Sequence, residues 1–186
     1  MALETAAIHE SLRDPLTGLF HGRYFVASLE REVHRMERRS LTLGVILLEV
    51  DGYAHLAESL GRDAAETLLC TLADLLKRRI RGGDVASRNR GGEFGLILPE
   101  APLEGVQTRA EQLRTAVRDL RARAGEDPLA SFTLSLGVAA FPDNGITAEK
   151  LLRAARTALD RSKADGCDRV TVAPGTLLDR RLMLPD

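Results

Sequence analysis

The stretch from Leu41 to Asp51 reads LTLGVILLEVD, and it is the part of the sequence that decides the fold. It is nearly continuous and apolar, and its acids, Glu49 and Asp51, come only at the end. A strand that is apolar on both alternating faces is typical of the centre of a sheet covered by helices on each side. The sequence therefore predicts an α/β domain built around this strand.

The flanking segments predict helices and further strands. Apolar residues at helical spacing predict helices over residues 23–39, 52–60, 63–80, 103–122 and 147–163. Residues 131–141 and 169–173 predict two more strands, and residues 84–99 predict a β-hairpin. The order predicts a central mixed sheet flanked by helices, and the hairpin makes part of that sheet antiparallel.

Length and composition limit the kinds of partner. The chain has 186 residues, 44% of them hydrophobic and 28% charged, which suits one domain. We expect a connector helix at residues 1–12, a domain at 13–174 and a tail at 175–186. The formal net charge of −1 gives no basic field for nucleic acid. No apolar run is long enough to cross a membrane, so we expect a cytoplasmic fragment without a membrane contact.

The hairpin has an unusual tip. Residues 90–94 read Arg-Gly-Gly-Glu-Phe, between the runs 84–87 and 94–99. Adjacent glycines allow the backbone to approach a bulky ligand, and a carboxylate beside them can orient a base or bind a metal. The tip is thus a candidate functional site. The alternative is a tight hairpin turn with a solvated Glu93.

Several motifs occur in an order that resembles one known family. They are Asp14-Pro15-Leu16-Thr17-Gly18-Leu19, Glu49-Val50-Asp51, Gly91-Gly92-Glu93-Phe94, Thr133-Leu134-Ser135-Leu136-Gly137-Val138-Ala139, and Lys163 before Gly166. Together they resemble the GGDEF domain of the diguanylate cyclase family, from about residue 13 to residue 173. The resemblance implies a nucleotidyl-cyclase palm-like fold. It also implies the joining of two GTP molecules into cyclic di-GMP across a homodimer, with Mg²⁺ on the phosphates.

The spacing of an upstream motif sets the register of the signature. Asp84, which closes Arg81-Gly82-Gly83-Asp84, stands six residues before Arg90. The resemblance then places Arg90 and Gly91 at the two glycines, Gly92 at the metal-binding acid, Glu93 at the guanine-contacting glutamate and Phe94 at the closing aromatic. The signature reads RGGEF and lacks a metal acid, which a shifted alignment does not recover. We therefore expect no appreciable cyclase activity and assign no catalytic residue among 90–94.

The rest of the implied nucleotide pocket is only partly retained. The resemblance assigns metal ligation to Glu49 and the Val50 carbonyl, and nucleotide binding to Glu66, Glu93 and Lys163. Two expected side chains are replaced, by Ala57 and Cys167. We expect no certain cofactor, and Mg²⁺ only together with GTP.

The upstream motif itself resembles the family's inhibitory site for cyclic di-GMP. Arg81 can donate a bidentate pair to a phosphate or a guanine, and Asp84 can accept from guanine. The expected helical arginine corresponds to Gln112, so Arg109 or Arg114 would have to substitute. The alternative is structural, because arginines and glycines are common where helices end.

The favoured hypothesis is a catalytically silent GGDEF domain that acts as a receptor for cyclic di-GMP. One alternative is a protein-interaction or dimerisation module that uses no nucleotide and contacts another protein or domain. Another is a weak diguanylate cyclase. GTP binding without turnover and homodimer formation remain open at this point.

Overall fold

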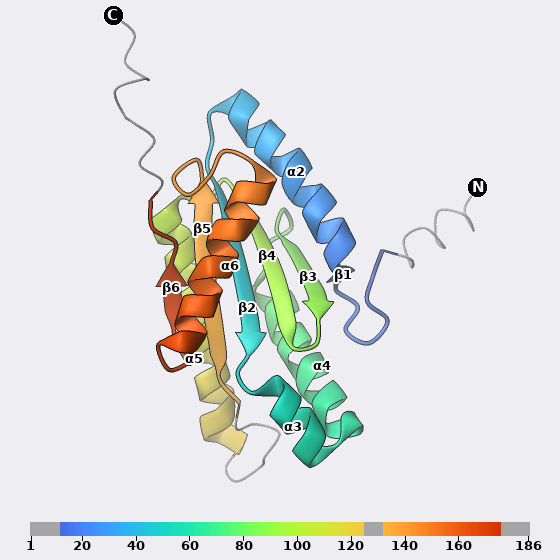
Figure 1. Cartoon of the computed structure of the whole chain (residues 1–186). Helices are drawn as coiled ribbons and strands as arrows, with labels where there is room; N and C mark the ends of the chain where they lie inside the picture. The colour runs from blue at the N-terminus through green and yellow to red at the C-terminus, as the bar shows by residue number, and fades with distance from the viewer. Residues whose placement is uncertain (1–11, 125–131, 176–186) are drawn as a thin grey trace, which may run out of the picture.

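The structure is a computed structural model that describes residues 12–124 and 132–175. The chain forms three layers, with a twisted sheet between two pairs of long helices (Figure 1). The predicted connector helix and tail lie almost entirely outside the described residues. None of the helices in the described part of the chain combines the length and the apolar character of a membrane span.

The helices and strands follow the predicted order. The strands are β1 Phe20–His21, β2 Leu43–Val50, β3 Val85–Arg90, β4 Glu93–Pro99, β5 Leu134–Phe141 and β6 Val170–Val172. The helices are α2 Gly22–Arg39, α3 Tyr53–Leu60, α4 Arg62–Arg79, α5 Leu103–Ala124 and α6 Ala148–Ala164. The predicted elements are confirmed to within a few residues at each end. The two-residue strand β1 was not predicted, because so short a strand has no periodicity to detect.

The sheet has the order β1-β3-β4-β2-β5-β6. Strand β2 pairs antiparallel with both β4 and β5, whereas the β1–β3 and β5–β6 pairs are parallel. The predicted mixed sheet is therefore confirmed, with the apolar stretch at its centre.

Side chains of β2 alternate between two hydrophobic cores. Ile46 and Leu48 pack with α4 and α5 on one face, and Val45 and Leu47 pack with α2 and α6 on the other. All four residues are at most 2% exposed. This double burial explains why the strand carries an almost continuous apolar run.

Helix α6 lies unusually close to the sheet. A Cβ atom at Gly137 on β5 would stand 2.2 Å from the carbonyl oxygen of Ala155 on α6. Only glycine permits this approach. The contact brings the polar side chains of α6 within reach of the carboxyl end of β2.

Candidate functional site

A groove of about 520 Å³ opens where β2 ends and the β3–β4 hairpin turns. It is lined by Glu49, Tyr53, Ala54, Arg90, Gly91, Gly92, Glu93, Arg156, Asp160 and Lys163. The structure thus brings together Glu49, the hairpin tip and Lys163, as the family resemblance implied. Glu66 does not line this groove and instead pairs with Arg62 on the exposed side of α4, at 2.7 Å.

Two carboxylates of the groove lie side by side in the sheet. Glu49 on β2 and Glu93 on β4 are register partners, so their side chains point to the same face. Like charges in this position destabilise a sheet unless they are compensated. Helix α6 supplies the compensation through Arg156 and Lys163, which lie seven residues apart and therefore on one helix face.

Glu93 is clamped by two side chains. Arg156 donates from Nη1 to Oε2 at 2.5 Å and from Nη2 to Oε1 at 2.6 Å, and Asn89 donates to Oε1 at 2.8 Å. Only 5% of Glu93 is exposed. Burial by itself would raise the pKa of the Glu93 carboxyl, but the hydrogen bonds from Arg156 and Asn89 outweigh it, and the pKa lies below its ordinary value.

Glu49 is held in a similar way but nearer to solvent. The Lys163 Nζ lies 2.9 Å from both carboxylate oxygens of Glu49. The side chains of Glu49 and Lys163 are 28% and 40% exposed, so this ion pair contributes less than the buried one. Both acids assigned to metal or guanine by the resemblance are therefore neutralised within the chain.

The glycine pair at the tip is packed against an aromatic ring. A Cβ at Gly92 would lie 2.7 Å from Cγ and 2.9 Å from Cβ of Tyr53. Gly91 has a φ of +50°, which glycine adopts readily. The side chain of Tyr53 thus occupies the space into which an acid at residue 92 would project.

These residues do not fit the divalent metal that the resemblance implies. Mg²⁺ requires several oxygen ligands, and Gly92 offers no side-chain oxygen. The amide of Val50 donates to the Gly92 carbonyl at 3.0 Å, and Glu49 faces Lys163. Within residues 12–124 and 132–175, no group of three or more His, Cys, Asp or Glu side chains is placed to hold a metal ion.

The sequence analysis did not identify the side chains that pair with the acidic residues near the groove. Arg156 received no role, although its seven-residue spacing from Lys163 was a usable signal. Asp51 was noted only as the end of the strand. It accepts from Thr133 Oγ1 at 2.7 Å and from Ser135 Oγ at 2.6 Å, and it thereby ties β2 to the start of β5.

Cys167, which stands at an expected arginine position, lies in the turn after α6 with a φ of +62°. Burial and the neighbouring carboxylate of Asp51 raise the pKa of its thiol. The thiol is therefore the neutral form at neutral pH, and it cannot supply the positive charge of an arginine.

The Arg81–Asp84 motif forms a closed turn at the other end of β3. Asp84 donates its amide to the Arg81 carbonyl at 3.0 Å, and its Oδ2 accepts from the Arg81 amide at 2.8 Å. Arg109 on α5 donates to the same Oδ2 at 3.1 Å and to the Arg79 carbonyl at 2.7 Å. The guanidinium of Arg81 has no hydrogen bond or ion pair to the described residues and is free to meet a ligand.

The two arginines named as substitutes have different positions. Arg109 reaches Asp84, whereas Arg114 donates to Glu111 at 2.9 Å and to Asp168 at 3.1 Å. Arg114 is therefore engaged away from the turn. The turn and the hairpin groove lie at opposite ends of β3, ~20 Å apart for a six-residue strand.

Comparison with known proteins identifies the family to which this architecture belongs. Residues 11–169 match the family described as diguanylate cyclase, GGDEF domain. The chain is 34% identical over 164 residues to the diguanylate cyclase DgcP of Pseudomonas aeruginosa and 32% identical over 171 residues to DgcM of Escherichia coli. These matches cover 88% and 92% of the chain but only 24% and 40% of the two relatives.

Solved structures agree with this match. The GGDEF domain of DgcB from Caulobacter crescentus in complex with c-di-GMP has a TM-score of 0.80 and 26% identity, covering 88% of this chain and 93% of that one. The diguanylate cyclase SiaD from Pseudomonas aeruginosa, in complex with its activator SiaC, has a TM-score of 0.81 and 31% identity, covering 92% and 65%. The fold is thus the palm of the nucleotidyl cyclase class. The chain belongs to the GGDEF domain family.

Proposed function

We propose that this GGDEF domain does not turn over GTP and acts as a receptor for cyclic di-GMP at the Arg81–Asp84 turn. The observation that carries the proposal is the contrast between the two ends of β3. At the hairpin end, the carboxylates of Glu49 and Glu93 are paired with Lys163 and Arg156. At the turn end, the guanidinium of Arg81 has no partner among the residues that the structure describes, and it lies on a turn that Asp84 holds closed.

The geometry of the groove supports the loss of turnover. Phosphoryl transfer depends on metal ions and cations that offset the charge developing on the phosphates. Here Gly92 provides no carboxylate, and Lys163 is engaged by Glu49. A GTP–Mg²⁺ complex would have to break the ion pairs of Glu49 and Glu93 and displace Tyr53.

The absence of cyclase activity is tested directly by an assay of cyclic di-GMP formation from GTP with Mg²⁺ or Mn²⁺. A diguanylate cyclase with an intact GGDEF signature serves as the positive control. We expect no product above the background without protein. Turnover at a rate similar to that of the control would overturn the proposal, and slow turnover above the background would overturn it in favour of a weak or partner-dependent cyclase.

The chemistry of the turn supports cyclic di-GMP as the ligand. An arginine fork donates two parallel hydrogen bonds to a phosphate or to guanine. The similar GGDEF domain of DgcB was solved in complex with c-di-GMP, which supports this dinucleotide as the ligand. Gly82 and Gly83 have no atoms within 4 Å of the positions that Cβ atoms would take. A flat base therefore meets no side chain between Arg81 and Asp84.

Isothermal titration calorimetry tests the receptor function. We expect cyclic di-GMP to bind the wild-type chain and Arg81→Ala to abolish the binding. Arg38→Ala, which removes an exposed arginine from α2 on the opposite face of the sheet, is the matched control and should bind normally. Absence of binding to the wild type would remove the receptor hypothesis.

One observation favours a second candidate function. Both glutamates of the groove, Glu49 and Glu93, are paired within the chain and Gly92 has no side-chain oxygen, which suits a protein-interaction or dimerisation module. Melting temperatures with GTP, GDP and cyclic di-GMP distinguish the two, because a ligand that binds only the native state raises the melting temperature. A flat response to all three favours the interaction module.

A further inference from the structure

A second groove lies between α2 and α6, on the face of the sheet opposite α4 and α5. Figure 1 shows the two helices diverging toward the end of the sheet at which the β3–β4 hairpin turns. The volume of this α2–α6 groove is about 430 Å³. Its apolar lining residues are Phe25, Val26, Leu47 and Leu152, and its arginines are Arg153 and Arg156. A groove of this size that combines apolar walls with a few polar groups is typical of a small-molecule site.

We propose that the α2–α6 groove binds a small organic carboxylate, that is, a molecule with an apolar body and one carboxylate group. The body lies between the two helices, and the carboxylate meets Arg153 and Arg156. This inference goes beyond the receptor function and does not depend on it, because none of the lining residues belongs to the Arg81–Asp84 turn.

The floor of the groove is apolar and tightly packed. Phe25 on α2 and Leu47 on β2 are only 1% and 2% exposed. The ring of Phe25 lies against β4 because residue 95 is a glycine, where a Cβ atom would stand 2.8 Å from Cε2 and Cζ of the ring. Val26 on α2 is 42% exposed and Leu152 on α6 is half-buried, so both walls leave apolar surface in contact with water. A ligand with an apolar body covers that surface, which is favourable in water.

The polar end of the groove has hydrogen-bond donors to spare. Arg156 donates one N–H from each of Nη1 and Nη2 to Glu93, which fixes the orientation of its guanidinium. A guanidinium has further N–H donors, and those of Arg156 make no hydrogen bond to the residues that the structure describes. Arg153, three residues earlier on α6, pairs with Glu149 through side chains that are 72% and 79% exposed. Such an exposed pair is weak, so Arg153 can turn toward a ligand.

The charge of the lining favours an anion. Arg156 is balanced by Glu93, so Arg153 leaves the groove with one positive charge in excess. A carboxylate offsets that charge and accepts hydrogen bonds from the arginines, whereas an ammonium group would add to the charge and be repelled.

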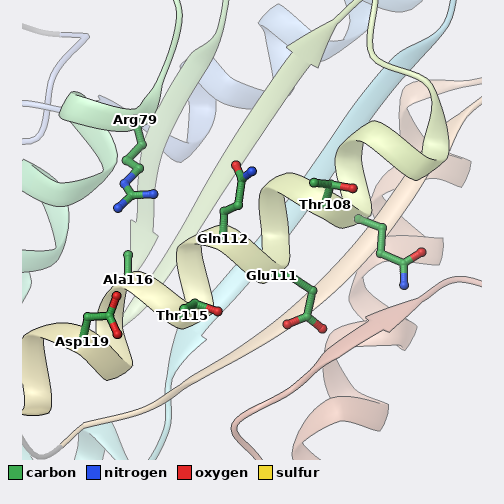
Figure 2. Close-up of a pocket in the computed structure, with 8 residues that line it drawn as sticks. Arg79, Thr108, Glu111, Gln112, Thr115, Ala116 and Asp119 are labelled. Atoms are coloured by element: carbon green, nitrogen blue, oxygen red, sulfur yellow. The ribbon is translucent and has the colours of Figure 1, made fainter.

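The groove between α4 and α5, which Figure 2 shows, has a different character. Apart from Ala116, the side chains that line it are polar or charged, among them Arg79, Gln112 and Asp119. The apolar body of the proposed ligand would have almost no surface to pack on there. The proposed class of ligand therefore suits the α2–α6 groove and not this one.

An NMR titration of the isotope-labelled chain tests the proposal. Three probes share one phenylbutyl body and differ only in the end group: phenylbutyrate, phenylbutanol and phenylbutylamine. We expect phenylbutyrate to shift the amide signals of α2 and α6 around the groove until saturation, with a Kd of about 1 mM, as is usual for a ligand of this size. Phenylbutanol should bind roughly fivefold more weakly, and phenylbutylamine more weakly still.

Two variants separate the contributions of the end group and the body. Arg153→Gln should weaken phenylbutyrate roughly threefold to tenfold and leave phenylbutanol unchanged, because only the carboxylate meets the guanidinium. Val26→Asn should weaken both probes, because both use the apolar wall. Arg161→Gln is the matched control, since Arg161 also forms an exposed pair on α6, with Asp165, but does not line the groove. It should bind both probes like the wild type.

The outcomes decide the proposal. Saturable shifts around the groove, with the expected order of affinities and the loss confined to phenylbutyrate in Arg153→Gln, would support the carboxylate site. Equal affinities for the three probes, shifts that do not saturate, or equal losses in Arg153→Gln and Arg161→Gln would overturn it.

Discussion

The side chain of Tyr53 stands against Gly92, so that a Cβ atom at residue 92 would lie 2.7 Å from Tyr53 Cγ. The contact joins the start of α3 to the hairpin tip. The aromatic side chain therefore fills the space beside residue 92, the position at which the family resemblance leads us to expect an acid.

Gly92→Ala should therefore destabilise the domain, by about 1–3 kcal/mol, as other overpacking substitutions do. Urea denaturation gives the free energy of unfolding. Gly83→Ala is the control, since a Cβ there meets nothing within 4 Å, and its stability should stay close to that of the wild type. Equal stabilities of the two variants would contradict the packing of Tyr53. For the same reason, Gly92→Asp should not restore cyclase activity.

Arg156→Gln should be among the more costly substitutions in α6. It leaves the largely buried Glu93 carboxylate without its bidentate partner, and an unpaired buried charge is strongly unfavourable. We expect a loss of about 1–3 kcal/mol, toward the low end because the Arg156 side chain is 37% exposed. Arg153→Gln breaks only an exposed pair with Glu149 on the same helix and should change the unfolding free energy little.

The free energy of unfolding should decrease as the pH is lowered, and protonation of Glu93 and Asp14 should contribute to the decrease. The pKa of each carboxyl lies below its ordinary value, 4.5 for Glu93 and 3.8 for Asp14. Burial acts to raise both, and hydrogen bonds from Arg156 and Asn89 to Glu93 and from Thr17 to Asp14 outweigh it.

Since both pKa values are depressed in the folded state, their contribution is present above the ordinary values and is lost as pH falls through the folded-state values. Denaturant unfolding between pH 7 and pH 3 measures this loss. Glu93→Gln should show a shallower decline than the wild type. An unchanged slope would mean that Glu93 is not held ionised in the fold.

Substitutions at Asp84 and Arg81 should distinguish an effect on the stability of the fold from an effect on ligand binding. Asp84 accepts from the Arg81 amide and from Arg109, and its side chain is only 7% exposed. Asp84→Ala should cost about 1–3 kcal/mol, because it leaves the Arg81 amide without its acceptor and the Arg109 guanidinium without its carboxylate partner.

Arg81→Ala removes an exposed side chain and should leave the unfolding free energy almost unchanged. If cyclic di-GMP binds as proposed, both variants lose binding but only Asp84→Ala loses stability. Equal effects of the two variants on stability would assign Arg81 a structural role in the turn.

Divalent metal ions should not change the melting temperature of the domain in the absence of nucleotide. Because Glu49 is held by Lys163 and Gly92 has no carboxylate, we expect the same melting temperature with Mg²⁺, with Mn²⁺ and with EDTA. A rise with either metal that EDTA reverses would show a metal site in the described groove or elsewhere in the chain.

Local pattern by itself determined much of this protein. The apolar run at residues 41–51 predicts the central strand, because a strand buried on both faces has few alternatives. The six-residue spacing from Asp84 to Arg90, together with the family resemblance, predicts that Gly92 stands where a metal-binding acid is expected. The order of helices and strands followed from periodicity.

Only the tertiary structure decided what the remaining side chains do. Arg156 lies 63 residues from Glu93 and Lys163 lies 114 residues from Glu49, and they meet because the register of β2 with β4 and the close packing of α6 bring them together. The same holds for Tyr53 against Gly92 and for Arg109 against Asp84. Such pairs depend on the packing of several elements at once, and no pattern within a single segment contains that information.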